Sequence, residues 1–220
     1  MGRRTFADSI GRNRAEALKS RGRSHSFKAG STLLHEGQVG DRVVLLLSGT
    51  VKVTYTTPAG REVVIGLCGS GDLLGELAVM DGRPRSNTVT ALEAVEAAVI
   101  PARDFRDFVR DPEMAVVMMR MLTERLRDAD RKQLDFASCD AVGRVSARLV
   151  ELAEHHGQSK DSGIEITVPM SQEELAGWSA CSREAVVRAL RMLRERGLIE
   201  TKRYRHIKVL DVDALRRQAG

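Results

Sequence analysis

The sequence is poor in cysteine and has no long apolar run. Its three cysteines, Cys68, Cys139 and Cys181, lie far apart and form no C-x-x-C pair that would indicate zinc, an iron–sulfur cluster or a redox pair. No apolar stretch approaches the roughly 18–20 residues of a membrane span, and the N-terminus lacks the apolar core of a signal peptide. We therefore expect reduced, buried thiols in a cytoplasmic protein with no metal site and no membrane partner.

Catalytic motifs are also missing. The 220 residues contain no Walker-type phosphate loop and no recognisable pairing of a nucleophile with a base. The sequence therefore predicts that the protein is not an enzyme and has no resident cofactor.

The composition is that of a globular protein, with 42% hydrophobic and 30% charged residues. The length suits one large or two small domains. The formal net charge of +5 is mild, but basic residues are concentrated at two places. Residues 1–28 hold eight basic and two acidic residues, which we interpret as a solvated helix and a frayed end, and residues 183–208 hold nine basic and three acidic residues. Such clusters suit a polyanionic partner.

Residues 25–110 are predicted to form a compact β-domain. Short β-branched runs alternate with glycine-bearing turns, a spacing that is typical of a barrel or sandwich. The expected strands are Val43–Leu47, Val51–Tyr55, Val63–Leu67, Thr88–Leu92 and Ala97–Ile100. The expected turns are at Gly30, Gly49, Gly60 and Gly82.

A long helix is predicted over residues 112–136. Asp111 can cap its first turn and Pro112 suits the first helical position. Apolar residues then recur at spacings of four, four and three: Met118, Leu122, Leu126 and Ala129. So narrow a stripe predicts packing against a second copy, as in a two-stranded coiled coil. The alternative is that it packs on the chain's own β-domain.

The C-terminal region begins with another helix, capped by Asp140. Its apolar face is expected to consist of Val145, Leu149, Leu152 and Ala153. A polar turn is predicted over residues 157–163 and a strand over residues 164–168.

Residues 171–197 predict a helix-turn-helix. Ser171 and Glu174 form a capping box at the start of a short helix that ends near Trp178. Ser182 caps a second helix, which runs to Arg196 and stops at Gly197. Two short helices joined by so tight a turn are typical of DNA-binding domains.

The second of these helices carries the candidate base-reading residues. Arg183 and Arg188 can pair with guanine and Glu184 can accept from cytosine. Lys202 and Arg203, on a predicted β-turn-β wing, suit phosphates. Further candidate DNA contacts lie at the starts of the two helices: Ser171, Gln172 and Ser182. The alternative is a basic face used for protein contacts.

The run Cys181-Ser-Arg-Glu-Ala-Val-Val-Arg188, followed by Leu190-Arg-Met-Leu193, resembles the recognition helix of the cyclic AMP receptor protein (CRP/FNR) family. The resemblance implies a homodimer formed through residues 112–136. It also implies binding of double-stranded DNA at an inverted repeat with TGTGA-like half-sites, and RNA polymerase as a further partner.

A second motif lies in the β-domain. The string Gly75-Glu-Leu-Ala, followed by Arg83-Pro-Arg-Ser-Asn-Thr-Val89, resembles the phosphate-binding cassette of cyclic nucleotide-binding domains. By this resemblance the backbone around Gly75 and Glu76, beside Leu77, holds the ribose and phosphate. The same resemblance implies that the Glu76 carboxylate accepts from the ribose 2′-hydroxyl, Arg85 balances the phosphate charge, and Ser86 bonds a phosphate oxygen.

The resemblance implies cyclic AMP as the effector, with one departure. The two helix positions that contact adenine in the family fall at Ala129 and Asp130, where the best-known members have hydroxyl residues. A carboxylate also pairs well with the guanine edge, so cyclic GMP is expected to compete better here. Alternatively, Asp130 faces solvent. The rival interpretations are a regulator with an altered pocket, controlled by another effector or constitutive, and a signalling protein that uses the β-domain as a regulatory cassette.

Together these features predict an α+β protein in four parts. They are a basic segment over residues 1–24, a cyclic nucleotide-binding β-roll over 25–110, a dimerisation helix over 111–138, and a winged helix-turn-helix over 139–220. Ligand bound between the roll and the helix is expected to favour one of two arrangements, with residues 136–140 as the hinge.

Overall fold

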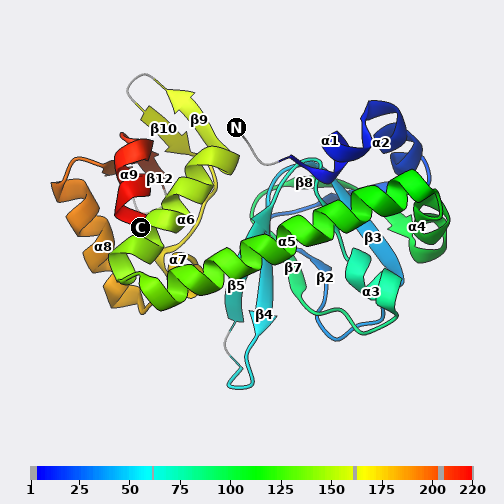
Figure 1. Cartoon of the computed structure of the whole chain (residues 1–220), viewed down its shortest axis with the longest axis horizontal. Helices are drawn as coiled ribbons and strands as arrows, with labels where there is room; N and C mark the ends of the chain where they lie inside the picture. The colour runs from blue at the N-terminus through cyan, green and yellow to red at the C-terminus, as the bar shows by residue number, and fades with distance from the viewer. Residues whose placement is uncertain (1–3, 61, 161–162, 203–205, 220) are drawn as a thin grey trace. The chain divides into compact units, whose positions relative to one another are not determined.

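The structure, a computed structural model, describes residues 4–60, 62–160, 163–202 and 206–219. The chain forms two compact units, one from Arg3 to Arg127 and the other from Asp128 to Gly220 (Figure 1). In the described part of the chain, no helix combines the length and the apolar character that crossing a membrane requires.

The first unit contains two four-stranded antiparallel sheets. One sheet has the order β1-β8-β3-β6 and consists of Arg23–Phe27, Val95–Pro101, Arg42–Ser48 and Leu73–Leu74. The other has the order β2-β7-β4-β5 and consists of Thr32–Leu34, Thr88–Ala91, Val51–Thr56 and Glu62–Cys68. The five strands expected from the sequence are all present. The three that the pattern missed, β1, β2 and β6, are either polar or only two or three residues long.

Strand β3 is buried on both faces, which explains its unbroken apolar run. Val43 and Leu45 enter one core with helices of this unit, whereas Val44 and Leu46 enter a second core between the sheets. Alternation along the strand therefore places side chains in two different cores.

The turn after β3 requires glycine. Gly49 has a φ of +81°, and a Cβ there would lie 2.3 Å from the carbonyl oxygen of Ala94. The predicted turns at Gly30, Gly60 and Gly82 also have positive φ.

The N-terminal segment is part of the first unit's core, so its interpretation as a solvated helix and frayed end was wrong. It forms α1 (Phe6–Ile10) and α2 (Arg12–Lys19), drawn in blue beside the start of α5 (Figure 1). Phe6, Ile10 and Leu18 are buried in the same core as Phe105 of α4 (Ala102–Val109). Three well-spaced apolar residues were enough to dock a mostly basic segment.

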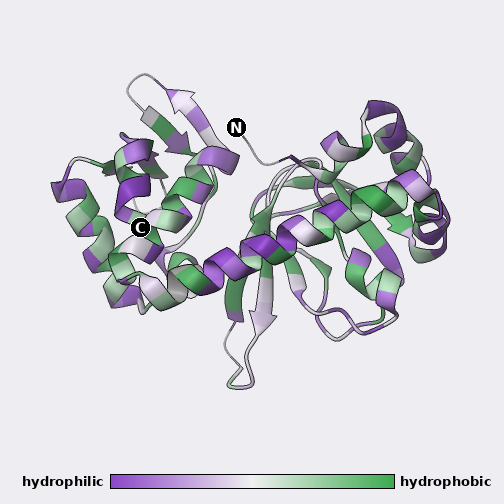
Figure 2. Cartoon of the chain, in the orientation of Figure 1, coloured by the Kyte–Doolittle hydropathy of each residue, from purple (hydrophilic) through white to green (hydrophobic). Residues whose placement is uncertain are grey.

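The predicted long helix is confirmed as α5 (Pro112–Ser138), and the Asp111 carboxylate accepts from the backbone N–H of Glu113 at 2.9 Å. The apolar stripe predicted to pack against a second copy was wrong at its first residue, Met118. Met118 is 1% exposed in the core of the first unit, while the neighbouring Met119 is 64% exposed. Figure 2 shows hydrophobic and hydrophilic blocks alternating along α5, with the strongest hydrophilic colour in its middle turns.

The second unit combines helices with a four-stranded sheet of order β11-β12-β10-β9. Its helices are α6 (Ala141–His156), α7 (Gln172–Trp178), α8 (Arg183–Glu195) and α9 (Val212–Ala219). Its strands are Ile199–Lys202, His206–Val209, Gly163–Ile166 and Gly157–Lys160, in sheet order. The predicted cap holds, since Asp140 accepts from the N–H of Gly143 at 2.8 Å.

The polar turn predicted over residues 157–163 was wrong, because residues 157–160 form the edge strand β9, paired with β10. Three of its four residues are exposed, so no apolar alternation marks the strand. Backbone pairing along one edge supports it instead.

Candidate functional site

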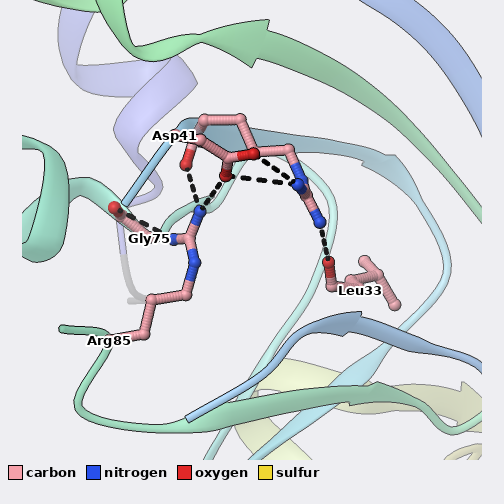
Figure 3. A network of polar contacts seen from close by, with 5 residues as sticks. Leu33, Asp41, Gly75 and Arg85 are labelled. Carbon is pink, nitrogen blue, oxygen red and sulfur yellow. Dashed lines mark hydrogen bonds and ion pairs between the residues drawn. The ribbon is translucent and has the colours of Figure 1, made fainter. Parts of the chain in front are cut away.

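Arg85 lies buried behind the glycine turn that precedes α3 (Glu76–Asp81), with its side chain only 3% exposed (Figure 3). Its Nη2 donates to the Arg42 carbonyl oxygen at 2.8 Å and to Asp41 Oδ1 at 3.1 Å. Its Nη1 is 3.5 Å from the Gly75 carbonyl oxygen. The guanidinium is therefore surrounded by oxygen acceptors that belong to the chain itself.

The Asp41 carboxylate is shared by two arginines. Arg42 Nη1 lies 2.9 Å from Asp41 Oδ2, and Arg42 Nη2 donates to the Leu33 carbonyl oxygen at 3.4 Å (Figure 3). Burial lowers the pKa of Arg85, against the opposing effect of the Asp41 hydrogen bond and charge. Partial burial alone would raise the pKa of Asp41, but the two arginines lower it overall.

Gly75 is required by this arrangement. It has a φ of +80°, and a Cβ there would lie 2.5 Å from Arg85 Nη1. The tight approach of backbone to guanidinium explains why the motif has glycine at this place.

Glu76 is 1% exposed, and its carboxylate forms an ion pair with Arg125 of α5. Arg125 also donates from Nη2 to the Leu73 carbonyl oxygen at 2.8 Å. Arg125 was not predicted from the sequence. A spacing of four, three and four residues from Met114 through Met118 and Met121 marks the helix face that leads to it.

The other predicted ligand residues are placed differently. Ser86 is exposed and its hydroxyl accepts from Asn87 Nδ2 at 3.0 Å, and Leu77 is exposed on α3. Ala129 and Asp130 are exposed on α5, within the second unit. The structure thus brings Gly75, Glu76 and Arg85 together, and their roles toward a ligand stay predictions.

The helix-turn-helix has both predicted caps. The Ser171 hydroxyl accepts from the N–H of Glu174 at 3.1 Å, and the Glu174 carboxylate accepts from the N–H of Ser171 at 2.9 Å. The Ser182 hydroxyl accepts from the N–H of Ala185 at 3.2 Å. Gln172, the first residue of α7, is half-buried.

Helix α8 has a buried face and an exposed basic face. Val186, Ala189, Leu190 and Leu193 are buried, whereas Arg183, Glu184 and Arg188 are exposed, as the sequence predicts. Hydrogen bonds from its own backbone N–H and from the Ser182 hydroxyl lower the pKa of Glu184. Glu184 therefore keeps its charge near neutral pH and can accept hydrogen bonds.

The wing predicted after α8 is present as strands β11 and β12. Lys202 is the last residue of β11, paired with His206, and nothing further is described of it. Arg203 lies outside the described residues. Their predicted phosphate contacts therefore stay predictions.

A cluster of four side chains joins α5, α6 and α7 within the second unit. Lys132 Nζ and the Arg148 guanidinium lie 5.8 and 5.7 Å from the centre of the Trp178 ring. Glu151 pairs with both cations, at 3.5 Å to Lys132 and 2.6 Å to Arg148. This charged cluster holds the last turns of α5 beside the helix-turn-helix.

The three cysteines differ in exposure, and none of them forms a disulfide. Cys68 is buried as predicted, whereas Cys139 and Cys181 are half-buried, so the expectation of burial was wrong for these two. Across the described residues, no group of histidine, cysteine and acidic side chains could hold a metal ion.

Two family models match the chain, one in each of the two units. Residues 24–111 match the cyclic nucleotide-binding domain and residues 143–218 match the Crp-like helix-turn-helix domain.

Similar proteins cover most of the chain. A CRP-like cAMP-activated global transcriptional regulator of Mycobacterium tuberculosis is 32% identical over 88% of this chain and 86% of its own length. The cAMP-activated global transcriptional regulator CRP of Salmonella typhimurium is 29% identical over 80% and 84%, respectively. A solved CRP-family transcriptional regulator from Thermus thermophilus is 28% identical, with a TM-score of 0.74 over 89% of this chain and 96% of that one. The cassette, the helix-turn-helix and these similarities together place the chain in the CRP/FNR family of cyclic nucleotide-regulated, DNA-binding transcriptional regulators.

Proposed function

We propose that this regulator is controlled by cyclic AMP bound at Arg85 and binds an inverted repeat as a homodimer. The observation that carries the proposal is the buried Arg85 guanidinium, whose acceptors are one carboxylate and two backbone carbonyls. A cyclic phosphate carries the negative charge that such a site can exchange for the Asp41 carboxylate. The names of the mycobacterial and enterobacterial relatives point to the same effector.

In the liganded site, Arg85 pairs with the phosphate and Ser86 donates to a phosphate oxygen. The Glu76 carboxylate, now paired with Arg125, accepts from the ribose 2′-hydroxyl, while the backbone of Gly75, Glu76 and Leu77 lines the sugar. A carboxylate can accept several hydrogen bonds, so Glu76 can keep its ion pair with Arg125 and also accept from the hydroxyl.

We assign the base-facing positions to Ala129 and Asp130. The Asp130 carboxylate can accept from adenine N6 and from the guanine edge. Calorimetry with cyclic AMP and cyclic GMP, on the parent protein and on Asp130→Ser, tests this assignment. The substitution should shift the affinity ratio toward cyclic AMP, and an unmoved ratio contradicts a base-facing Asp130.

The DNA contacts follow from the exposed face of α8. Arg183, Glu184 and Arg188 read base edges in the major groove. Phosphate contacts come from the wing and from the starts of the two helices: Lys202, Arg203, Ser171, Gln172 and Ser182. We expect TGTGA-like half-sites.

Dimerisation uses the exposed side of α5. Met119, Leu122, Leu126 and Ala129 recur at spacings of three, four and three, which is the seam of a coiled coil. A two-fold axis along this seam would place two reading helices about one DNA turn, roughly 34–36 Å, apart. Leu126→Glu should give monomers in light scattering, because Leu126 is 62% exposed and the fold does not need it. Arg127→Glu, on another face, is the matched control.

The experiment that tests the whole proposal is a titration of the purified protein with cyclic AMP while its affinity for DNA is recorded. Ligand must bind two arrangements unequally to change DNA binding, with residues 136–140 as hinge. DNA affinity should rise or fall with cyclic AMP. Unchanged affinity would indicate an altered pocket or constitutive binding. In this proposal the protein acts in the cytoplasm, without enzymatic activity, and contacts RNA polymerase.

A further inference from the structure

One apolar side chain on the exposed face of α8 is not explained by the fold. Val187 is 44% exposed, one helical turn after Arg183 and one turn before Arg191. The buried face of the helix is already filled by its neighbour Val186 and by the residues one turn further on. Val187 therefore contributes little to the core of the second unit.

Val187 neither favours the helix nor forms side-chain hydrogen bonds, which are the two usual contributions of an exposed helix residue. A β-branched residue lowers helix propensity relative to alanine. Valine has no hydrogen-bond donor, so it cannot hold a phosphate. Its exposed neighbours on the helix are the charged side chains Arg183, Glu184, Arg188 and Arg191. An apolar side chain surrounded by charged ones can pack against an apolar group on a partner that is otherwise polar.

In the major groove, the apolar group on a base edge is the C5 methyl of thymine. We propose that Val187 is a specificity-determining residue that packs against this methyl group, between the bases that Arg183 and Arg188 read. The inference rests on the proposed base-reading role of α8 and assigns one thymine of each half-site to the Val187 side chain. Because cytosine has hydrogen where thymine has methyl, the contact selects thymine without any hydrogen bond.

The test separates the methyl group from base pairing. A site is first selected from random duplexes with the parent protein, and each thymine is then replaced singly by deoxyuridine, which pairs identically but lacks the methyl. We expect one thymine per half-site at which the replacement lowers affinity about fourfold, the change for burying one methyl-sized group. Replacing this thymine in both half-sites should lower the affinity about fifteenfold.

Two variants assign the effect to the side chain. Val187→Ala should bind the thymine and uracil duplexes with a smaller difference than the parent protein, because its shorter side chain buries less of the methyl group. The fold is preserved because alanine favours the helix. Met192→Ala, at another exposed apolar position of α8, should keep the fourfold difference. The inference would be overturned if the parent protein bound every uracil duplex as tightly as the thymine duplex. It would also be overturned if Val187→Ala kept the full affinity difference between the two duplexes. A parent protein with no sequence preference would overturn the proposed base reading as well.

Discussion

The two units present their key arginines in opposite ways. In the first unit, Arg85 is buried and its acceptors belong to the chain itself, from Asp41, Arg42 and Gly75. In the second unit, Arg183 and Arg188 are exposed on a helix with a packed rear face. A ligand that bound Arg85 would have to replace these internal contacts, whereas the arginines of α8 are already exposed to a partner.

This difference indicates where regulation can arise. In the proposed site, exchange of the Asp41 contact for phosphate would alter the surroundings of β3 and the turn before α3, so ligand binding would change conformation there. The proposed base reading by the face of α8 needs no such exchange, because its side chains are already exposed. We therefore expect substitutions in the first unit to change control and those in the second to change sequence preference.

The largest expected effect is that of Arg85→Ala, which removes the buried arginine of the first unit. Removing the buried cation should weaken cyclic nucleotide binding at least about 100-fold, since charge-assisted contacts in a site of this kind contribute about 3 kcal/mol. Calorimetry measures the affinity, and circular dichroism checks folding. Arg83→Ala is the control, because Arg83 is exposed in the same loop. Equal losses in both variants would contradict the assigned role.

The next largest effect is expected from the exposed arginines of α8 in the second unit. Arg188→Ala should cost about 1–3 kcal/mol on the preferred site and relax preference at one base pair. Lys202→Ala should weaken all sequences alike and reduce the salt dependence of binding. Binding-site selection with both variants distinguishes these outcomes. Unchanged sequence preference in Arg188→Ala would refute base reading by this residue.

Local patterns were enough for the elements that depend on few residues. The caps at Ser171 and Ser182 are hydrogen bonds between residues three positions apart, and the glycine turns follow from a positive φ at a single residue, so both could be predicted locally. The exposed face of α8 followed from helical period alone. The two motifs led to the family for the same reason, since each is a short continuous string.

Contacts between distant residues could not be read from the sequence. The Asp41–Arg85 and Glu76–Arg125 pairs join positions 44 and 49 residues apart, and no local pattern specifies such pairs. The choice between Met118 and Met119 as core residue depends on where α5 meets the sheets. Strand β9 was missed because an edge strand needs no apolar face.

A smaller effect is expected in the charged cluster around Trp178, which joins α5, α6 and α7 in the second unit. Glu151→Gln removes the carboxylate that pairs with Lys132 and the buried Arg148, and should lower the free energy of unfolding by about 1 kcal/mol. Glu195→Gln breaks an exposed pair with Arg191 and should cost less than about 0.5 kcal/mol. Urea unfolding followed by fluorescence of Trp178, the chain's single tryptophan, measures both. Equal costs would show that the cluster adds nothing beyond a surface pair.

The smallest effect is the pH dependence of Asp41, the internal partner of Arg85, whose carboxylate also lies beside Arg42. The pKa of Asp41 is lowered from its ordinary value of 3.8, so its ionised form favours the folded state. This contribution is present above that ordinary pKa and is lost as pH falls through the lowered pKa. Asp41 is 59% exposed, so solvent screening limits it to about 0.5 kcal/mol. Asp41→Asn should therefore be slightly less stable than the parent protein at pH 6, with the difference closing as the pH falls through the lowered pKa of Asp41. Chemical denaturation across this range measures it, and a difference that stays constant with pH would show that Asp41 acts by shape alone.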